Sequence, residues 1–119
     1  QGGRGVDSDE DYVFNPEDYL GTWYSTNGRV TITISKLTEK SVTFTYQQTN
    51  KKGTATCEAK VKKSVAGNAA RVSFTDSLGN KATGYLTFDN GQLYVKIKTK
   101  TKAEGAGVHP SVDCIMVRG

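Results

Sequence analysis

The chain has 119 residues, of which 35% are hydrophobic and 24% are charged, and its net charge at neutral pH is +4. This length suits one domain with a modest core, and no stretch approaches the roughly 20 consecutive apolar residues of a membrane-spanning helix. Residues 1–18 hold six acidic side chains and one basic one, whereas the remainder holds 15 basic and six acidic ones. The composition therefore predicts a soluble, basic body that follows an acidic leader.

The leader comes first in the chain. Residues 1–11 are rich in glycine and acidic side chains and nearly free of apolar ones. We expect them to be disordered, ahead of a single domain over residues 12–119, because such a segment has too little apolar surface to bury. Since the chain begins at Gln1 and not at a methionine, we also expect a processed product.

A helix-start signal follows over residues 15–18, Asn-Pro-Glu-Asp. Proline at the first helical position, with acidic side chains in the first turn, is typical of a helix N-terminus. Only one turn fits before Gly21. We expect this turn to plug one end of the domain, with Tyr19 and Leu20 pointing inward.

From Gly21 onward the hydrophobic pattern has a period of two, which is typical of β-strands with one buried face. Apolar and polar residues alternate clearly over residues 30–35, Val-Thr-Ile-Thr-Ile-Ser. The turns between the alternating segments are rich in Asn and Gly, which tolerate a positive φ angle. The pattern predicts eight strands, at residues 22–26, 29–35, 41–48, 54–62, 70–76, 82–88, 92–99 and 111–117.

Short sequential connections favour a meander, because a Greek key needs long returns. Eight antiparallel strands in a meander predict an all-β, eight-stranded up-and-down barrel, which removes both edges of the sheet. A two-sheet sandwich is the alternative. Both leave the strands with one apolar face, which forms the core.

Gly21-Thr22-Trp23 on the first strand, together with Arg118 at the end of the last, resembles the calycin group of lipocalins and avidins. The resemblance implies a barrel closed at the Trp23 end, with the arginine packed over the indole, and thus a structural role for both residues. It does not imply biotin binding, because the chain has one tryptophan. Ser25 and Arg29 also stand where avidins have an asparagine and a serine.

Catalysis has little support in the sequence. The single histidine, His109, lies in the longest loop, over residues 100–110, without a nucleophile beside it in the sequence. The chain has no phosphate-binding glycine motif followed by a helix. It also has no CxxC and no Cys/His cluster. We therefore expect a protein that is not an enzyme and that has no cofactor and no metal site.

The two cysteines, Cys57 and Cys114, are compatible with one disulfide or with two buried thiols. They fall on the fourth and eighth predicted strands, which lie opposite each other in an eight-stranded barrel. Inward side chains at that separation exceed the roughly 7 Å limit between Cα atoms of a disulfide, so a bridge would require a flattened barrel.

Binding is better supported, because an eight-stranded barrel has room for one small ligand unless side chains fill it. Phe44, Tyr46 and Phe74 are the aromatic candidates for a ligand-lining wall. The loops at the end opposite Trp23 are basic, so we expect an apolar or anionic small ligand at this mouth. The basic candidates are Arg29, Lys51, Lys52, Lys100 and Lys102.

These features predict a secreted or surface-displayed bacterial binding module of the lipocalin type, such as a lipoprotein. The alternative is a protein-interaction domain, an inhibitor or adhesin, that acts through loops 49–53 and 100–110 over a filled core. A third hypothesis is a polyanion-binding stripe along Lys96, Lys98, Lys100 and Lys102. The simpler interpretation of that stripe is a solvated face, so nucleic acid is not the partner that we expect.

Overall fold

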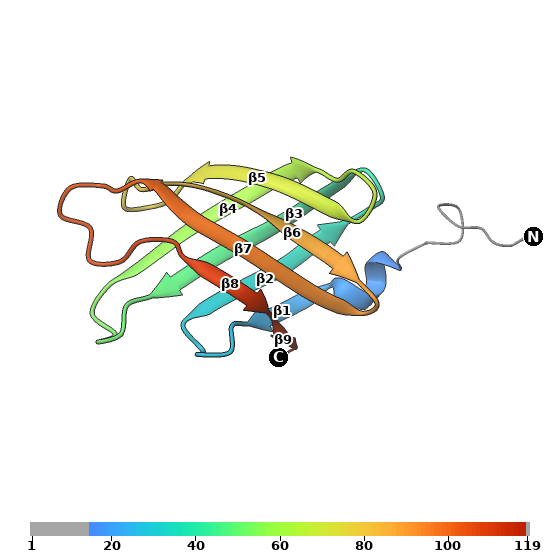
Figure 1. The fold of residues 1–119 in the computed structure, drawn as a ribbon, viewed down its shortest axis with the longest axis horizontal. Coiled ribbons are helices and arrows are strands. Elements are labelled where there is room, and N and C mark those ends of the chain that lie inside the picture. The colour runs from blue at the N-terminus through green and yellow to red at the C-terminus, as the bar shows by residue number, and fades with distance from the viewer. Residues whose placement is uncertain (1–14, 119) are drawn as a thin grey trace, which may run out of the picture.

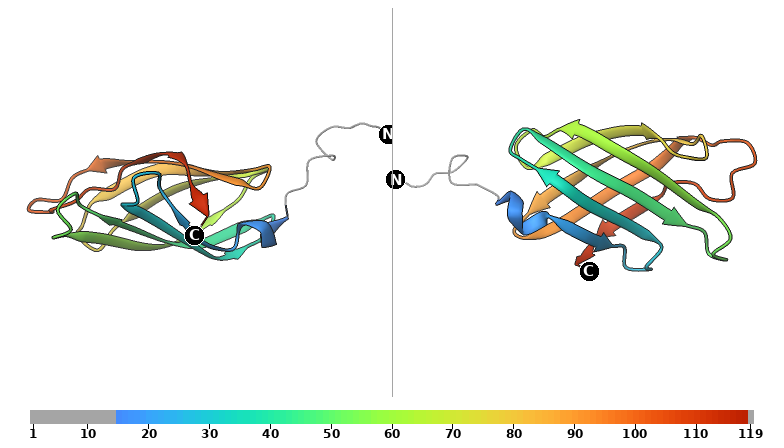
Figure 2. Two further views of the ribbon diagram at one scale, coloured as in Figure 1. Left: turned by 90° about the horizontal axis from the view of Figure 1, so that it is seen from below. Right: turned by 180° about the vertical axis from the view of Figure 1, so that it is seen from behind.

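The computed structural model describes residues 15–118, and the expected disordered leader lies outside the described residues. The all-β prediction is confirmed: the strands form two antiparallel sheets that pack face to face (Figures 1 and 2). The strands are β1 (Gly21–Tyr24), β2 (Val30–Leu37), β3 (Ser41–Thr49), β4 (Thr56–Ser64), β5 (Ala69–Thr75), β6 (Lys81–Asp89), β7 (Gln92–Thr101), β8 (Val112–Ile115) and β9 (Val117–Arg118).

The first sheet has the strand order β4-β3-β2-β1-β9, and the second has the order β5-β6-β7-β8. Each predicted strand is present, but the last one is divided. β8 pairs with β7 of the second sheet, whereas β9 pairs with β1 of the first. The chain changes sheets at Met116, which stays buried in the core while its N–H donates to the carbonyl of Leu93 at 2.7 Å. The final strand therefore joins the two sheets along one side.

Along the other side, β4 and β5 meet only near their ends. Ala66 and Ala69 form a bridge at the turn between them. Farther along, Ser77 in the loop after β5 donates its N–H to the carbonyl of Glu58 on β4 at 2.8 Å. No ladder joins β4 to β5, and the described strands make two sheets in place of the continuous eight-stranded ring that the sequence predicts.

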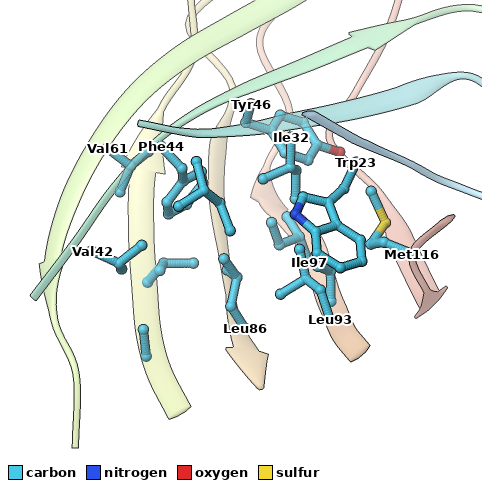
Figure 3. Close-up of a cluster of buried hydrophobic side chains, with 14 of the residues drawn as sticks. Trp23, Ile32, Val42, Phe44, Tyr46, Val61, Leu86, Leu93, Ile97 and Met116 are labelled. Atoms are coloured by element: carbon cyan, nitrogen blue, oxygen red, sulfur yellow. The ribbon is translucent and has the colours of Figure 1, made fainter. Parts of the chain in front are cut away.

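The core lies between the two sheets, where alternate residues of each strand point inward. Figure 3 shows Ile32, Phe44 and Tyr46 of the first sheet facing the aliphatic side chains of the second. Phe44, Tyr46 and Ile32 are at most 1% exposed, so the space between the sheets is filled by large side chains. This packing follows from the period-two pattern, because each strand offers an apolar residue at every second position.

A 3-10 helix, η1 (Pro16–Tyr19), packs at one end of the domain. Tyr19 is buried, as predicted, and its hydroxyl accepts a hydrogen bond from the N–H of Gly91 at 3.0 Å. The prediction for Leu20 is wrong, since this side chain is 39% exposed. The backbone is already extended at Leu20, so its side chain points opposite to that of Tyr19. Over residues 15–118, no helix has the length and apolar character that crossing a membrane requires.

Candidate functional site

Three loops lie together at the end of the domain opposite η1 (Figure 1): residues 50–55, 76–80 and 102–111. A buried asparagine, Asn80, holds two of them together. Its Nδ2 donates to the carbonyl of Val108 at 3.0 Å, and its Oδ1 accepts from the N–H of Ala103 at 2.8 Å. Asn50 adds a longer contact from its Nδ2 to the carbonyl of Gly107, at 3.4 Å. The loop end is therefore fixed by hydrogen bonds from side chains to backbone.

Asp76 belongs to the same hydrogen-bond network as Asn80. It is 6% exposed, and its Oδ2 accepts from Asn80 Nδ2 at 2.9 Å. Its Oδ1 accepts from the backbone N–H groups of Leu78 and Asn80, both at 2.9 Å, which forms the local turn. The sequence indicates a turn here through Gly79 and Asn80. It does not reveal that the same side chains anchor the loop over residues 102–111.

The predicted aromatic wall lies inside the domain. Phe44 and Tyr46 are buried, Phe74 is partly buried, and the rings of Tyr46 and Phe74 lie 5.5 Å apart. The Tyr46 hydroxyl donates to Gln48 Oε1, which also accepts from the N–H of Ser111 at 2.8 Å. These side chains pack against one another and contribute to the filled core.

Both cysteines are free thiols in the structure, with Cys57 buried, as one of the two alternatives expects of both residues, and Cys114 only partly buried. Burial, and next to it the negative charge of Asp76, raises the pKa of Cys57 to about 12. Burial also raises the pKa of Tyr46 well above its usual value, with Cys57 as the second cause. Both groups therefore stay protonated at neutral pH, and Cys57 lacks the thiolate that a nucleophile needs.

The predicted basic residues are divided between loops and one strand. Arg29, Lys51, Lys52 and Lys102 are exposed and stand on three different loops. Lys100 lies on the outer face of β7, two positions before Lys102, and it lines a hollow with residues of β5 and β6. Within the described part of the chain, no group of three or more His, Cys, Asp or Glu side chains could hold a metal ion.

This loop-end hollow is open to solvent and has a volume of about 650 Å³. It lies on the outer face of β5, β6 and β7, and the register places Ser73 beside Thr83 and Thr83 beside Lys98. Three lysines and three hydroxyl side chains line it, and no carboxylate does among the described residues. The lining residues are Ser73, Phe74, Thr75, Lys81, Ala82, Thr83, Lys98 and Lys100.

The charged side chains that line the hollow are all positive, and its hydroxyls can donate hydrogen bonds. Lysine ammonium groups and hydroxyls donate to the oxygen atoms of sulfate, phosphate or carboxylate groups. Because the lysines are exposed, a bound anion keeps part of its water shell, and the interaction is sensitive to salt. The arrangement suits reversible binding of an anion.

The sequence indicates part of this hollow, because Lys96, Lys98 and Lys100 alternate along one strand. It misses Ser73, Thr75 and Thr83. The period-two pattern gives their outward direction, but only the register between strands shows that they stand beside the lysines.

No protein-family model matches this chain, and no curated protein is significantly similar to it.

Proposed function

We propose that the protein is a binding module without catalytic activity, secreted or displayed on the cell surface, that holds an anionic ligand in the loop-end hollow. The observation that carries the proposal is the lining itself, in which three lysines and three hydroxyls, and no carboxylate of residues 15–118, are present. An uncompensated cluster of this kind attracts anions and raises their rate of encounter.

We further propose that the two sheets form a flattened barrel of the calycin type. The order of the strands in each sheet supports this, because neighbouring strands are consecutive in the chain except for β9, which pairs with β1. The change of sheet at Met116 joins them on one side, and the Glu58–Ser77 contacts connect them on the other. The Arg118 guanidinium lies 4.5 Å from the centroid of the Trp23 ring, as in the pair that the calycin resemblance implies.

The filled interior favours a site on the outside of this barrel. Phe44 and Tyr46 occupy the space that an internal ligand would need, and removing large core side chains from such packing is costly. An anionic ligand inside would also lose its water shell next to apolar groups. The outer hollow offers both charge and solvent, so the proposed ligand is anionic and bound outside.

The test is titration of the purified chain with sodium sulfate at low ionic strength, followed by NMR amide shifts. We expect saturable shifts at Lys81, Lys98 and Lys100 that disappear in about 1 M chloride, since exposed charges are then strongly screened. Lys98→Gln with Lys100→Gln should weaken the binding of sulfate at least about threefold.

The matched control is Lys36→Gln with Lys60→Gln, which removes the same charge from the outer face of the first sheet. It should change sulfate binding much less than the variant in the hollow. Equal effects of the two double variants would show only nonspecific attraction by net charge, and the proposed site would then be wrong.

A further inference from the structure

A second hollow lies on the same outer face, at the end of β5 that follows the β4–β5 turn. This turn-end hollow has a volume of about 510 Å³. Two cations line it, Lys63 and Arg71, and no carboxylate does among the described residues. Its lining residues are Lys63, Ser64, Ala66, Ala69, Arg71 and Tyr85.

The two hollows adjoin along β5. The outward residues of this strand are Ala69 and Arg71, which line the turn-end hollow, followed by Ser73 and Thr75, which line the loop-end hollow. Residues two apart on a strand are neighbours on the same face of a sheet. At about 3.3 Å per residue, the four positions span roughly 20 Å. This is much longer than a single sulfate or phosphate group.

Residues paired across β5, β6 and β7 form rows that extend the same surface. Arg71 stands beside Tyr85, which stands beside Lys96, and the next row carries Ser73, Thr83 and Lys98. The carboxylate of Asp113 lies beside Lys96, but it accepts a hydrogen bond from the Tyr94 hydroxyl at 2.6 Å. Each of these two rows therefore carries a cation, and Asp113 is the one carboxylate beside them among the described residues of the rows.

Tyr85 provides an apolar surface between the two hollows. Its side chain is 38% exposed, and its ring lies 6.0 Å from that of Tyr94 at an angle of 49°. The neighbouring ring limits the freedom of Tyr85, so a ligand that contacts it loses little additional entropy. An exposed aromatic ring beside cations and hydroxyls fits a ligand that has both apolar C–H faces and charged groups.

We infer that the two hollows form one continuous groove for a linear anionic polysaccharide, whose sulfate or carboxylate groups meet the cations and whose sugar ring packs on Tyr85. This inference rests on the proposed anion site and extends it. The hydroxyls of Ser64, Ser73, Thr75 and Thr83 match a ligand that itself carries many hydroxyls. A single-stranded nucleic acid fits less well, because such surfaces stack successive bases on several aromatic rings, whereas Tyr85 is the one aromatic ring with an outward position among the described residues that line the two hollows.

The experiment measures the binding of the full chain to heparin oligosaccharides of increasing length and to oligogalacturonates, which carry carboxylates in place of sulfates. We expect the longest oligosaccharides to bind at least about tenfold more tightly than a disaccharide, because only they reach both hollows. Lys63→Gln with Arg71→Gln should remove this advantage of length and weaken disaccharide binding less than it weakens the binding of the long oligosaccharides. Lys98→Gln with Lys100→Gln should weaken the binding of the disaccharide and of the long oligosaccharides.

Two further measurements identify the contacts. Each double variant should reduce the slope of log affinity against log salt by roughly two, because each lost cation releases one fewer counterion. Tyr85→Ala should weaken the long oligosaccharides about threefold without a change in that slope, since a ring contact releases no counterion. The Lys36→Gln, Lys60→Gln control should resemble the wild type in both length dependence and salt slope. Fluorescence of Trp23 shows whether each variant is folded.

The outcomes separate this inference from the proposed function. If affinity is independent of length and Lys63→Gln with Arg71→Gln is neutral, the continuous groove is wrong, while weaker sulfate binding by the loop-end variant still supports the anion site. If the loop-end variant binds every anion as well as the wild type does, the proposed function is wrong. Tighter binding of single-stranded DNA than of both kinds of oligosaccharide, weakened by the same variants, would overturn the assignment of the ligand.

Discussion

Arg118 lies over Trp23 in the structure, with its guanidinium carbon 4.5 Å from the centroid of the indole ring. The same guanidinium donates to two backbone carbonyls, those of Leu20 at 2.8 Å and Asp18 at 2.6 Å. The indole Nε1 donates to the carbonyl of Tyr19 at 2.9 Å. The last strand is thus held to the first strand and to η1 at a single corner.

Replacing Arg118 should loosen that corner. Arg118→Ala removes a cation–π contact and two charge-assisted hydrogen bonds, and we expect it to lower the free energy of unfolding by about 2 kcal/mol. Arg118→Lys should retain part of this stabilisation, because an ammonium group keeps the positive charge but lacks the planar guanidinium that reaches both carbonyls. Urea unfolding followed by the fluorescence of Trp23 measures the effect. Arg71→Ala, on an exposed outer face, is the control, and an equal loss in both variants would contradict a special role for this corner.

Much of the fold can be predicted from the sequence, because it depends on local patterns. The alternation over residues 30–35 identifies β2 and its buried face, and the Gly21-x-Trp23 motif directs attention to Arg118. The position where the last strand changes sheets cannot be predicted in this way. Met116 is one apolar residue in an alternating segment, and its place between β8 and β9 depends on strands distant in the sequence.

The candidate site, too, can be predicted from the sequence only in part. The lysines on β7 are visible as an alternating stripe, whereas the hydroxyls of Ser73 and Thr83 are ordinary outward positions of other strands. The register across β5, β6 and β7 brings them together. The anchoring role of Asn80 is likewise hidden, because its partners Ala103 and Val108 lie in a loop with no recognisable motif.

Gly84 lies on β6, where β7 approaches it closely. A Cβ atom at this position would lie 2.7 Å from the Cα atom of Ile97 and closer still to the carbonyl oxygen of Lys96. Gly84→Ala should therefore force β6 and β7 apart and lower the free energy of unfolding by about 3 kcal/mol. Thermal and urea unfolding measure this loss.

Gly53→Ala separates this steric effect from the general cost of replacing glycine. Gly53 has a φ angle of 74°, but a Cβ atom there would have no neighbour within 4 Å. We expect a loss of only about 1 kcal/mol, from the left-handed backbone conformation. A Gly84→Ala variant no less stable than Gly53→Ala would show that β6 and β7 adjust freely, contrary to the prediction.

Asn80→Ala should release the loop over residues 102–111. The substitution leaves the N–H of Ala103 and the carbonyl of Val108 without their partner in a buried setting, and we expect a loss of about 2–3 kcal/mol. Hydrogen exchange of the Ala103 amide should accelerate by more than the change in global stability explains, because the loop opens locally. Asn50→Ala, at a less buried contact with the same loop, should have a smaller effect. Unchanged exchange at Ala103 in Asn80→Ala would argue against the anchoring role.

Cys57 and Tyr46 should make the folded protein sensitive to alkaline pH. Burial is the main cause that raises both pKa values, and the pKa of Cys57 rises from 9.0 to about 12. Below about pH 9 the thiol is protonated in both the folded and the unfolded chain, so its contribution to stability is complete. Above that pH the unfolded chain loses the proton first, which favours unfolding.

Between about pH 9 and pH 12, the titration of Cys57 should therefore lower the free energy of unfolding by up to about 1.4 kcal/mol per pH unit. Cys57→Ala should flatten the decline from pH 9 onward, whereas Tyr46→Phe should flatten only the part above about pH 10, where an ordinary tyrosine ionises. Cys114→Ala, which removes the other and less buried thiol, is the matched control, and Cys57→Ala should flatten the decline more than it does. Thiol labelling at pH 8 provides an independent measurement: Cys114 should react in the folded protein, and Cys57 only after unfolding. Rapid labelling of Cys57 in the folded state would contradict its burial beside Asp76.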